Sequence, residues 1–130
     1  MNLVIDTHAL VWYLTGHDRR LSARARRALA AAETGRSTIH VPVAVLMELV
    51  LLEQAGRLRL SYRTLREQLA LRPGFPLEPM LPEDVDEARG LGMLVDPFDR
   101  LIAGTALRLQ LPLMTNDGLI TTSGRVRTFW

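Results

Sequence analysis

The chain has 130 residues, of which 48% are hydrophobic and 23% are charged, and its formal net charge is +2. This composition predicts a single globular domain over residues 1–130 with a sizeable core, without room for a second domain. Cysteine is absent, which excludes disulfides and thiolate zinc sites. All sixteen basic residues are arginine, which suits phosphate binding, although a coding bias toward Arg and Ala is the simpler explanation.

The chain carries no sequence signal for export or membrane insertion. Its N-terminus lacks a basic segment followed by an apolar one, so we expect no signal peptide. The longest apolar run, residues 41–52, is too short to cross a bilayer and is interrupted by Glu48. We therefore expect a soluble cytoplasmic protein that does not associate with membranes.

The first half of the chain alternates between strand and helix signals. Short apolar runs predict strands, and apolar residues at helical spacing predict helices. Ser22 and Ser61 are suitable helix N-caps. The nearly continuous apolar sequence after Pro42 predicts a helix that is buried on most of its faces. The expected order is strand 3–5, helix 7–14, helix 23–32, strand 38–41, helix 43–55 and helix 61–71.

The second half continues the alternation. Glu83 and Asp84 lie in the first turn of an expected helix, where the helix dipole favours acids. The expected order is strand 77–80, a helix from Pro82, a helix from Asp96-Pro97 to about Gln110, strand 113–115 and a short last strand within 125–129. Strands that alternate with helices predict a parallel sheet covered on both faces. Ligands of such sheets bind at the carboxyl ends of the strands.

Four acids lie inside or at the end of apolar segments, where an unpaired carboxylate is costly. Asp6 and Asp117 each follow a predicted strand, Glu48 lies within the apolar helix, and Asp99 lies in the first turn of the helix that starts at Asp96. The joint pattern predicts one acidic pocket that holds a divalent metal. Because carboxylate oxygens are hard ligands, the expected metal is Mg²⁺ or Mn²⁺.

Taken singly, most of these acids have a structural explanation. Asp6 and Asp96 are placed as helix N-caps, and Asp117-Gly118 has the composition of a turn. Glu48 lacks such an explanation, because its neighbours at helical offsets are aliphatic. Only the joint occurrence of the four acids favours a metal site over helix capping.

Other catalytic patterns are absent. The three histidines, His8, His17 and His40, do not have the spacing of a zinc hydrolase. The chain also contains no Walker A loop, no Gly-x-Gly-x-x-Gly sequence and no serine nucleophile elbow.

Several segments resemble the PIN-domain ribonucleases, and specifically the VapC-type toxins of bacterial toxin–antitoxin pairs. The most specific is Asp-Pro-Phe-Asp-Arg-Leu-Ile-Ala at 96–103; segments 4–12 and 113–117 and Glu48 complete the match in the family's order. The resemblance covers nearly the whole chain. It implies a three-layer α/β/α fold with a central, mainly parallel sheet. Many relatives carry a histidine shortly before the Asp-Pro-Phe-Asp sequence, where this chain has Met93-Leu94-Val95.

The resemblance also implies a metal-dependent endoribonuclease. Water would hydrolyse an RNA phosphodiester to leave 5′-phosphate and 3′-hydroxyl ends, with Mg²⁺ as cofactor and Mn²⁺ as a substitute. The implied catalytic and metal-binding residues are Asp6, Glu48, Asp99 and Asp117, and the implied supporting residues are Thr7, Thr115 and Asn116. Arg100, Arg125 and Arg127 are candidates for positioning phosphates, although a solvated surface charge is the simpler interpretation of each.

By the same resemblance, the partners are the RNA substrate, a small antitoxin and a second copy of the chain. The antitoxin's C-terminal arm would lie in a groove between helices 43–55 and 61–71 and place a basic side chain in the acidic pocket. Exposed apolar surface at Leu49, Leu52 and Leu58 would suit that groove, but core packing explains these residues equally well.

Three alternatives stay open at this point. A PIN-type nuclease of RNA processing or repair would have the same residues and no toxin role. A receiver-like or flavodoxin-like Mg²⁺-binding module is disfavoured by the absence of lysine. A binding protein with a degenerate pocket is disfavoured because all four family acids are present.

Overall fold

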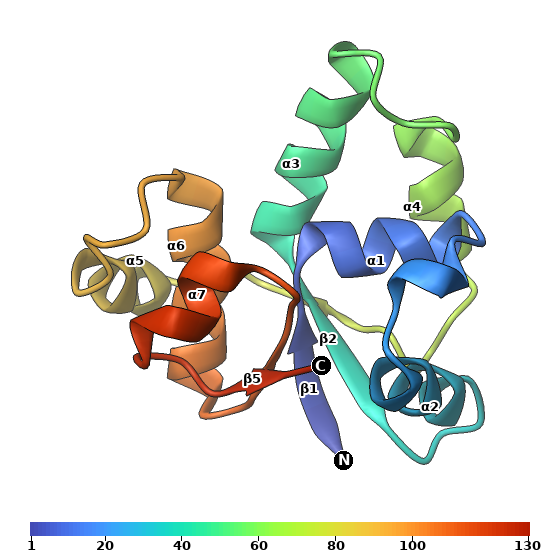
Figure 1. The fold of residues 1–130 in the computed structure, drawn as a ribbon. Helices are drawn as coiled ribbons and strands as arrows, with labels where there is room; N and C mark the ends of the chain where they lie inside the picture. Colours follow the sequence, from blue (N-terminus) through green and yellow to red (C-terminus); the bar gives the residue numbers. More distant parts are fainter.

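A parallel sheet of five strands organises the fold. The computed structural model describes residues 1–130, and its strand order is β3-β2-β1-β4-β5 with every neighbouring pair parallel (Figure 1). The strands are β1 Asn2–Ile5, β2 Thr38–Pro42, β3 Leu77–Glu78, β4 Leu113–Met114 and β5 Thr128–Phe129. The helices are α1 Thr7–Leu14, the 3-10 helix η1 Asp18–Arg20, α2 Ala23–Glu33, α3 Val43–Gln54, α4 Tyr62–Ala70, α5 Pro82–Arg89, α6 Pro97–Leu109 and α7 Gly118–Ser123.

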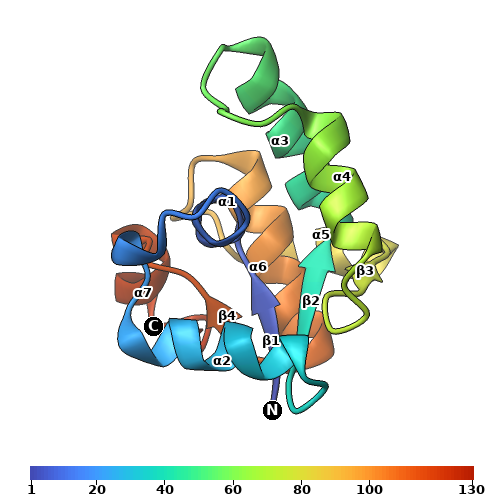
Figure 2. The same cartoon turned by 90° about the vertical axis from the view of Figure 1, so that its right-hand side faces the viewer.

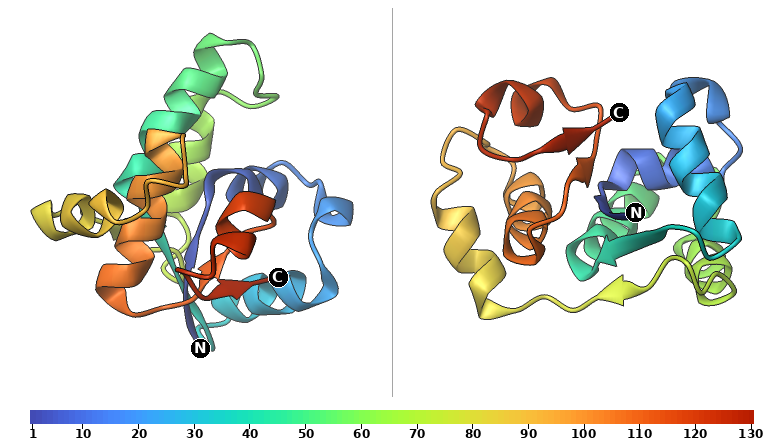
Figure 3. Two further views of the ribbon diagram at one scale, coloured as in Figure 1. Left: turned by 60° about the vertical axis from the view of Figure 1, so that its left-hand side comes forward. Right: turned by 90° about the horizontal axis from the view of Figure 1, so that it is seen from below.

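Helices cover both faces of the sheet. α1, α2 and α4 lie on one side, and α5 and α6 lie on the other (Figures 1 and 3). The central strand β1 has Leu3, Val4 and Ile5 fully buried, as expected for a strand covered on both faces. α3 and α4 pack side by side and project beyond the carboxyl ends of the strands (Figures 1 and 2). The predicted three-layer α/β/α class with a parallel sheet is confirmed.

The strand order excludes one alternative. In flavodoxin-like and receiver-like folds the order is 2-1-3-4-5, so β3 lies directly beside β1. Here β4 takes that position, through the pairs Val4–Leu113 and Ile5–Met114, and β3 lies beyond β2. The receiver-like interpretation is therefore wrong at the level of topology.

Helix caps follow the sequence closely. Ser22 and Ser61 accept hydrogen bonds from the backbone N–H groups of Ala25 and Thr64, at 3.0 and 3.1 Å. Asp96 accepts from the N–H groups of Phe98 and Asp99, at 2.7 and 3.2 Å, ahead of Pro97 in the first turn of α6. The predicted helix starts are confirmed because capping is a local property of the chain.

Two features of the helices differ from the expectation. α3 was expected to be buried on most faces, yet Met47 and Leu51 are 50% and 41% exposed. This expectation is wrong because the helix projects past the sheet, which leaves one apolar face uncovered. The short helix α7 was not predicted, because its sequence Gly-Leu-Ile-Thr-Thr-Ser has low helix propensity.

A buried ionic cluster joins α5 to α6. Asp84 lies in the first turn of α5, as predicted, but it is fully buried. It accepts hydrogen bonds from the guanidinium of Arg108 and, at 3.0 Å, from the hydroxyl of Thr105. Arg108 also donates to Glu78 at 3.0 Å, and both carboxylates keep the pKa of its guanidinium above the usual value. The cluster satisfies the charges that burial would otherwise leave unpaired.

None of the helices has the length and the apolar run that a membrane crossing requires.

Candidate active site

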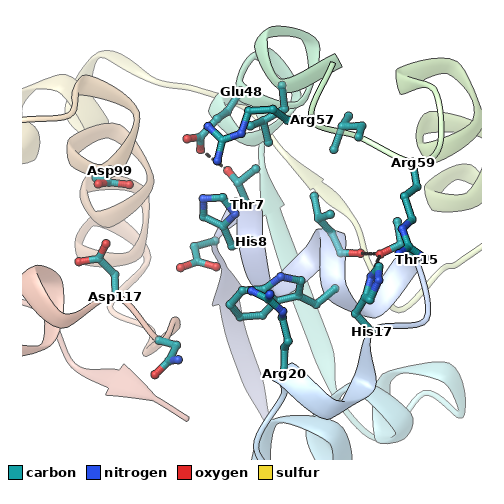
Figure 4. A pocket seen from close by; sticks show the side chains of 16 residues that line it. Thr7, His8, Thr15, His17, Arg20, Glu48, Arg57, Arg59, Asp99 and Asp117 are labelled. Atoms are coloured by element: carbon teal, nitrogen blue, oxygen red, sulfur yellow. Dashed lines mark hydrogen bonds between the residues drawn. The ribbon is translucent and has the colours of Figure 1, made fainter. Parts of the chain in front are cut away.

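The four predicted acids line one open pocket of about 520 Å³ at the carboxyl ends of the strands. Asp6 follows β1, Asp117 follows β4, Glu48 projects from α3 and Asp99 projects from α6 (Figure 4). Thr7 and Asn116 line the same pocket, and Thr115 is buried against Asp6. The structure thus brings together all seven residues that the sequence analysis named, from four separate elements.

Asp6 lies directly after β1 and is held by two hydrogen bonds. It caps α1 by accepting a hydrogen bond from the N–H of Ala9 at 3.0 Å, and it accepts a second one from the hydroxyl of Thr115. Desolvation is the main cause that raises its pKa from 3.8 to about 6, and Glu48 adds repulsion. The two hydrogen bonds oppose this increase. The capping interpretation of Asp6 is confirmed, and the same carboxylate also faces the pocket.

Asp99 sits where other carboxylates repel it. Its pKa is raised from 3.8 to about 7, first by desolvation and then by repulsion from Asp96, Asp117, Glu48 and Asp6. No hydrogen bond reaches its side chain. The repulsion shows that these acids share one electrostatic environment, although no two of them lie on the same element except Asp96 and Asp99.

The other two acids also accept hydrogen bonds, one from a distant part of the chain and one from a neighbouring residue. Glu48 accepts a hydrogen bond from the hydroxyl of Thr7, which follows Asp6 in sequence. Asp117 caps α7 by accepting from the N–H of Ile120 at 2.9 Å. The Asp117-Gly118 pair therefore begins a helix and is not an isolated turn. Glu48 and Asp117 thus each combine a structural hydrogen bond with a position on the pocket wall.

The donor set fits a hard divalent cation. The pocket offers four carboxylates and the amide of Asn116, without sulfur ligands, and oxygen ligands are preferred by Mg²⁺ and Mn²⁺. A cation would relieve the repulsion that raises the pKa of Asp99. As positioned, no three Asp, Glu or His side chains lie close enough to chelate one ion.

Basic and aromatic side chains line the rest of the pocket. They are Arg20, Arg57, Arg59, Trp12, His8 and His17, and Arg57 extends toward Glu48 in Figure 4. In Figure 4, Asp99 and Asp117 lie on one side of the pocket, and His17 and Arg59 lie on the other. The sequence analysis did not identify these arginines. The alternation Arg-Leu-Arg-Leu at 57–60 is the one local signal that could have indicated them.

The arginines considered earlier lie elsewhere. Arg100 donates to the carbonyl of Leu94 at 2.5 Å, and Arg127 donates to the carbonyl of Gln110 at 2.9 Å. Arg125 reaches the carbonyl of Gly90 at 3.4 Å. None of the three lines the pocket. Arg125 and Arg127 are exposed, as the simpler interpretation expects, whereas Arg100 is half-buried against the carbonyls of Leu94 and Gly92.

The apolar residues considered for a partner groove separate into two groups. Leu49 is fully buried in the core, so the expectation of exposed apolar surface there is wrong. Leu52 and Leu58 are half-buried and line the pocket.

Solved structures of similar fold include three toxin–antitoxin or related proteins. VapBC2 from Rickettsia felis, bound to a DNA fragment from its promoter, aligns with a TM-score of 0.70 and 15% identity, covering 99% of this chain and 98% of that chain. VapC20 from Mycobacterium tuberculosis, described as a sarcin-ricin loop cleaving toxin, gives 0.62 and 17%, covering 95% of each chain. FitAcB from Neisseria gonorrhoeae gives 0.65 and 19%, covering 98% and 96%. At these identities the likeness shows the fold alone.

No curated protein matches the chain in sequence. The PIN domain family model matches residues 3–120, which include all four pocket acids. The match spans most of the 130 residues. The chain therefore belongs to the PIN domain family.

Proposed function

We propose that the chain is a metal-dependent endoribonuclease that acts as the toxin of a type II toxin–antitoxin pair. The observation that carries the proposal is the convergence of Asp6, Glu48, Asp99 and Asp117 on one pocket at the carboxyl end of the sheet. The raised pKa values of Asp6 and Asp99 support it, because strongly perturbed acids in a cleft are typical of functional sites. Membership of the PIN domain family and the fold shared with VapC structures support it further.

In this proposal the four carboxylates hold Mg²⁺, or Mn²⁺ in its place, and Asn116 lies beside them. A divalent cation in such a site activates water and neutralises charge on the phosphodiester. The hydroxyls of Thr7 and Thr115 orient the carboxylates of Glu48 and Asp6 through the hydrogen bonds described above. The expected products carry 5′-phosphate and 3′-hydroxyl ends.

The partners are part of the same proposal. A small antitoxin would occupy the groove between α3 and α4 and place a basic side chain in the acidic pocket. The fold shared with the VapBC2 and FitAcB structures supports an antitoxin partner. A homodimer in the cytoplasm is the assembly that we expect. A PIN-type nuclease without toxin function would use the same pocket and would lack the antitoxin.

The test is cleavage of total cellular RNA by the purified chain without partner proteins. Reactions contain Mg²⁺, Mn²⁺ or a chelator, and compare the unmodified chain with Asp99→Asn. Asp86→Asn is the matched control, because Asp86 is exposed on α5 and does not line the pocket. Discrete fragments that require both metal and Asp99 are expected. Equal cleavage by Asp99→Asn, or cleavage in chelator, would overturn the assignment of the site.

The toxin role has its own test. Induced expression of the chain in a bacterial host should stop growth, and the Asp99→Asn variant should not. Metal-dependent cleavage in vitro without growth arrest would favour the processing nuclease.

A further inference from the structure

We propose that the basic wall of the pocket, formed by Arg20, Arg57 and Arg59, binds a second phosphate of a single-stranded RNA whose scissile phosphate lies at the acidic wall. This inference rests on the proposed function, and it assigns a substrate-positioning role to three residues outside the acidic set. The three arginines and the four acids line the same pocket. The two walls therefore can contact one bound molecule at once.

The three pocket arginines have no acidic partner. No carboxylate lies within 4 Å of any of their guanidinium groups, as is also true of every other arginine except Arg63, Arg72 and Arg108. The three pocket arginines are exposed, so no protein anion neutralises them. An unpaired cluster of arginines beside an acidic wall is suited to a ligand with several negative charges, because arginine binds phosphate through two parallel donors.

The loop between α3 and α4 holds Arg57 and Arg59 in a defined orientation. Residues 57–60 alternate Arg-Leu-Arg-Leu, and Leu58 and Leu60 pack against the core. Arg57 and Arg59 therefore project from the loop toward solvent and the pocket (Figure 4). The loop is anchored at both ends: the N–H of Arg57 donates to the carbonyl of Leu52 at 2.9 Å, and that of Tyr62 donates to Glu53 at 2.7 Å. The arginines thus stand on an ordered loop.

Arg20 is held against an aromatic ring of the pocket. Its guanidinium lies over the ring of Trp12, 5.5 Å from the centroid, in a cation–π contact. Trp12 is in turn flanked by His8 at 6.1 Å and by Trp130 at 6.1 Å between ring centroids. His8, Trp12 and Arg20 therefore form a continuous row of aromatic and basic side chains that lines the pocket. Exposed His8 offers an aromatic surface on which an unpaired base can stack.

The charges and aromatic rings of the pocket together indicate the class of ligand. Four carboxylates repel a phosphate, so binding energy must come from cations nearby. On a nucleic acid strand, the anionic group nearest to a bound phosphate is the phosphate of the adjacent nucleotide. An acidic peptide would also satisfy the arginines, but it would place no group suited to the aromatic series or to cleavage at the acidic wall. The observations therefore favour single-stranded RNA over an acidic segment of a partner protein.

The experiment measures binding of a fluorescein-labelled, mixed-sequence RNA 12-mer by anisotropy, in chelator so that no cleavage occurs. The unmodified chain is compared with Arg57→Gln/Arg59→Gln and with Arg57→Lys/Arg59→Lys. The control is Arg27→Gln/Arg89→Gln, which removes the same charge from exposed sites on α2 and α5 outside the pocket. Each titration is repeated from 50 to 250 mM KCl.

The dependence of RNA affinity on salt concentration shows whether Arg57 and Arg59 contact phosphate. Each phosphate contact on a single strand contributes about 0.7 to the slope of log K against log salt. The Gln pair should weaken binding several-fold and reduce the slope by about 0.7 to 1.4, and the Lys pair should keep most of the slope. The control pair should leave the slope unchanged. Equal losses in the Gln pair and the control pair would overturn the proposal.

Two further readouts separate this inference from the proposed function and from a protein ligand. In Mg²⁺, the Gln pair should raise KM for RNA cleavage and leave kcat nearly unchanged. If no variant cleaves but the slope still depends on Arg57 and Arg59, the nuclease proposal fails and the binding site stands. If a 12-residue polyglutamate displaces the RNA at equal concentration, and loses affinity in the Gln pair, the wall belongs to an acidic partner and the proposal is overturned.

Discussion

The hydroxyl of Thr115 donates a hydrogen bond to the carboxylate of Asp6, 109 residues earlier in the chain. Thr115 follows β4 and Asp6 follows β1, so the bond joins the ends of two neighbouring strands beneath the pocket. The same hydroxyl accepts from the N–H of Asp117 at 3.0 Å. One buried side chain therefore orients one pocket acid directly and a second acid through its backbone.

Loss of this hydroxyl should change the titration of Asp6. The bond from Thr115 lowers the pKa of Asp6, which stands at about 6. Thr115→Val should therefore raise that pKa further, and Thr115→Ser should restore it. Carbon NMR titration of the Asp6 carboxyl measures the shift. Thr122→Val, which removes an exposed hydroxyl on α7, serves as the control. An unchanged pKa in Thr115→Val would show that the bond does not tune Asp6.

The pocket acids should make the metal-free protein less stable as the pH rises. Asp6 and Asp99 have pKa values of about 6 and about 7 in the folded chain, above 3.8. Between pH 4 and 7 the folded state thus binds more protons than the unfolded state. The free energy of unfolding falls as pH rises through this window, and the loss from these two groups is complete above it. Urea unfolding at pH 5 and pH 8 in chelator measures the difference.

Asp99→Asn should reduce that pH dependence. Because Asn stays neutral, the variant should be more stable than the unmodified chain at pH 8, by roughly 1–2 kcal/mol once solvent screening of a half-exposed group is allowed for. Asp86→Asn should keep the original pH dependence. Addition of Mg²⁺ at pH 8 should stabilise the unmodified chain more than Asp99→Asn, since only binding to the folded state adds stability. Identical curves for all three chains would contradict this account.

Neutralising Asp84, the buried acid outside the pocket, should destabilise the fold, in contrast to Asp99→Asn. Asp84 has the guanidinium of Arg108 and the hydroxyl of Thr105 as partners and is fully buried. Asp84→Asn leaves Arg108 with a single carboxylate partner, and it should lower the free energy of unfolding at pH 7 by about 3 kcal/mol. Asp86→Asn, two residues on, should change it by less than about 0.5 kcal/mol. A stabilising effect of Asp84→Asn would show that the desolvation of Asp84 costs more free energy than its ion pair with Arg108 contributes.

The close approach of α5 and α6 should make Gly104 intolerant of substitution. A Cβ atom at Gly104 would lie 2.4 Å from the carbonyl oxygen of Asp84, a backbone atom that cannot move aside on its own. Gly104→Ala should destabilise the fold by roughly 3 kcal/mol. Gly118→Ala has nothing within 4 Å and should be neutral or slightly stabilising. Thermal melting of both variants tests the difference, and equal melting temperatures would rule out the steric explanation.

The parts of the fold that depend on neighbouring residues could be predicted from the sequence. Caps such as Ser22 and Asp96 act within three residues, and the alternation of strands and helices indicated the parallel sheet. Asp6 and Asp117 could be expected to meet because the carboxyl ends of parallel strands share one edge. Glu48 could be singled out because its helix is otherwise aliphatic.

The remaining features depend on contacts between distant segments. Nothing around Asp84 distinguishes it from an exposed first-turn acid, because its partner Arg108 lies on another helix. The exposure of Met47 and Leu51 follows from how far α3 extends past the sheet, which periodicity does not report. The basic wall was missed because Arg20, at the end of η1, and Arg59, after α3, line one pocket only in the folded chain.

The central position of β1 has a consequence for when the pocket first exists. β2 and β3 pair on one side of β1, but Asp99 and Asp117 arrive only with α6 and β4, on the other side. A nascent chain grows from its N-terminus. A nascent chain that ends before α6 carries only two of the four pocket acids, Asp6 and Glu48. The proposed nuclease site thus cannot assemble until β4 and Asp117 have been made.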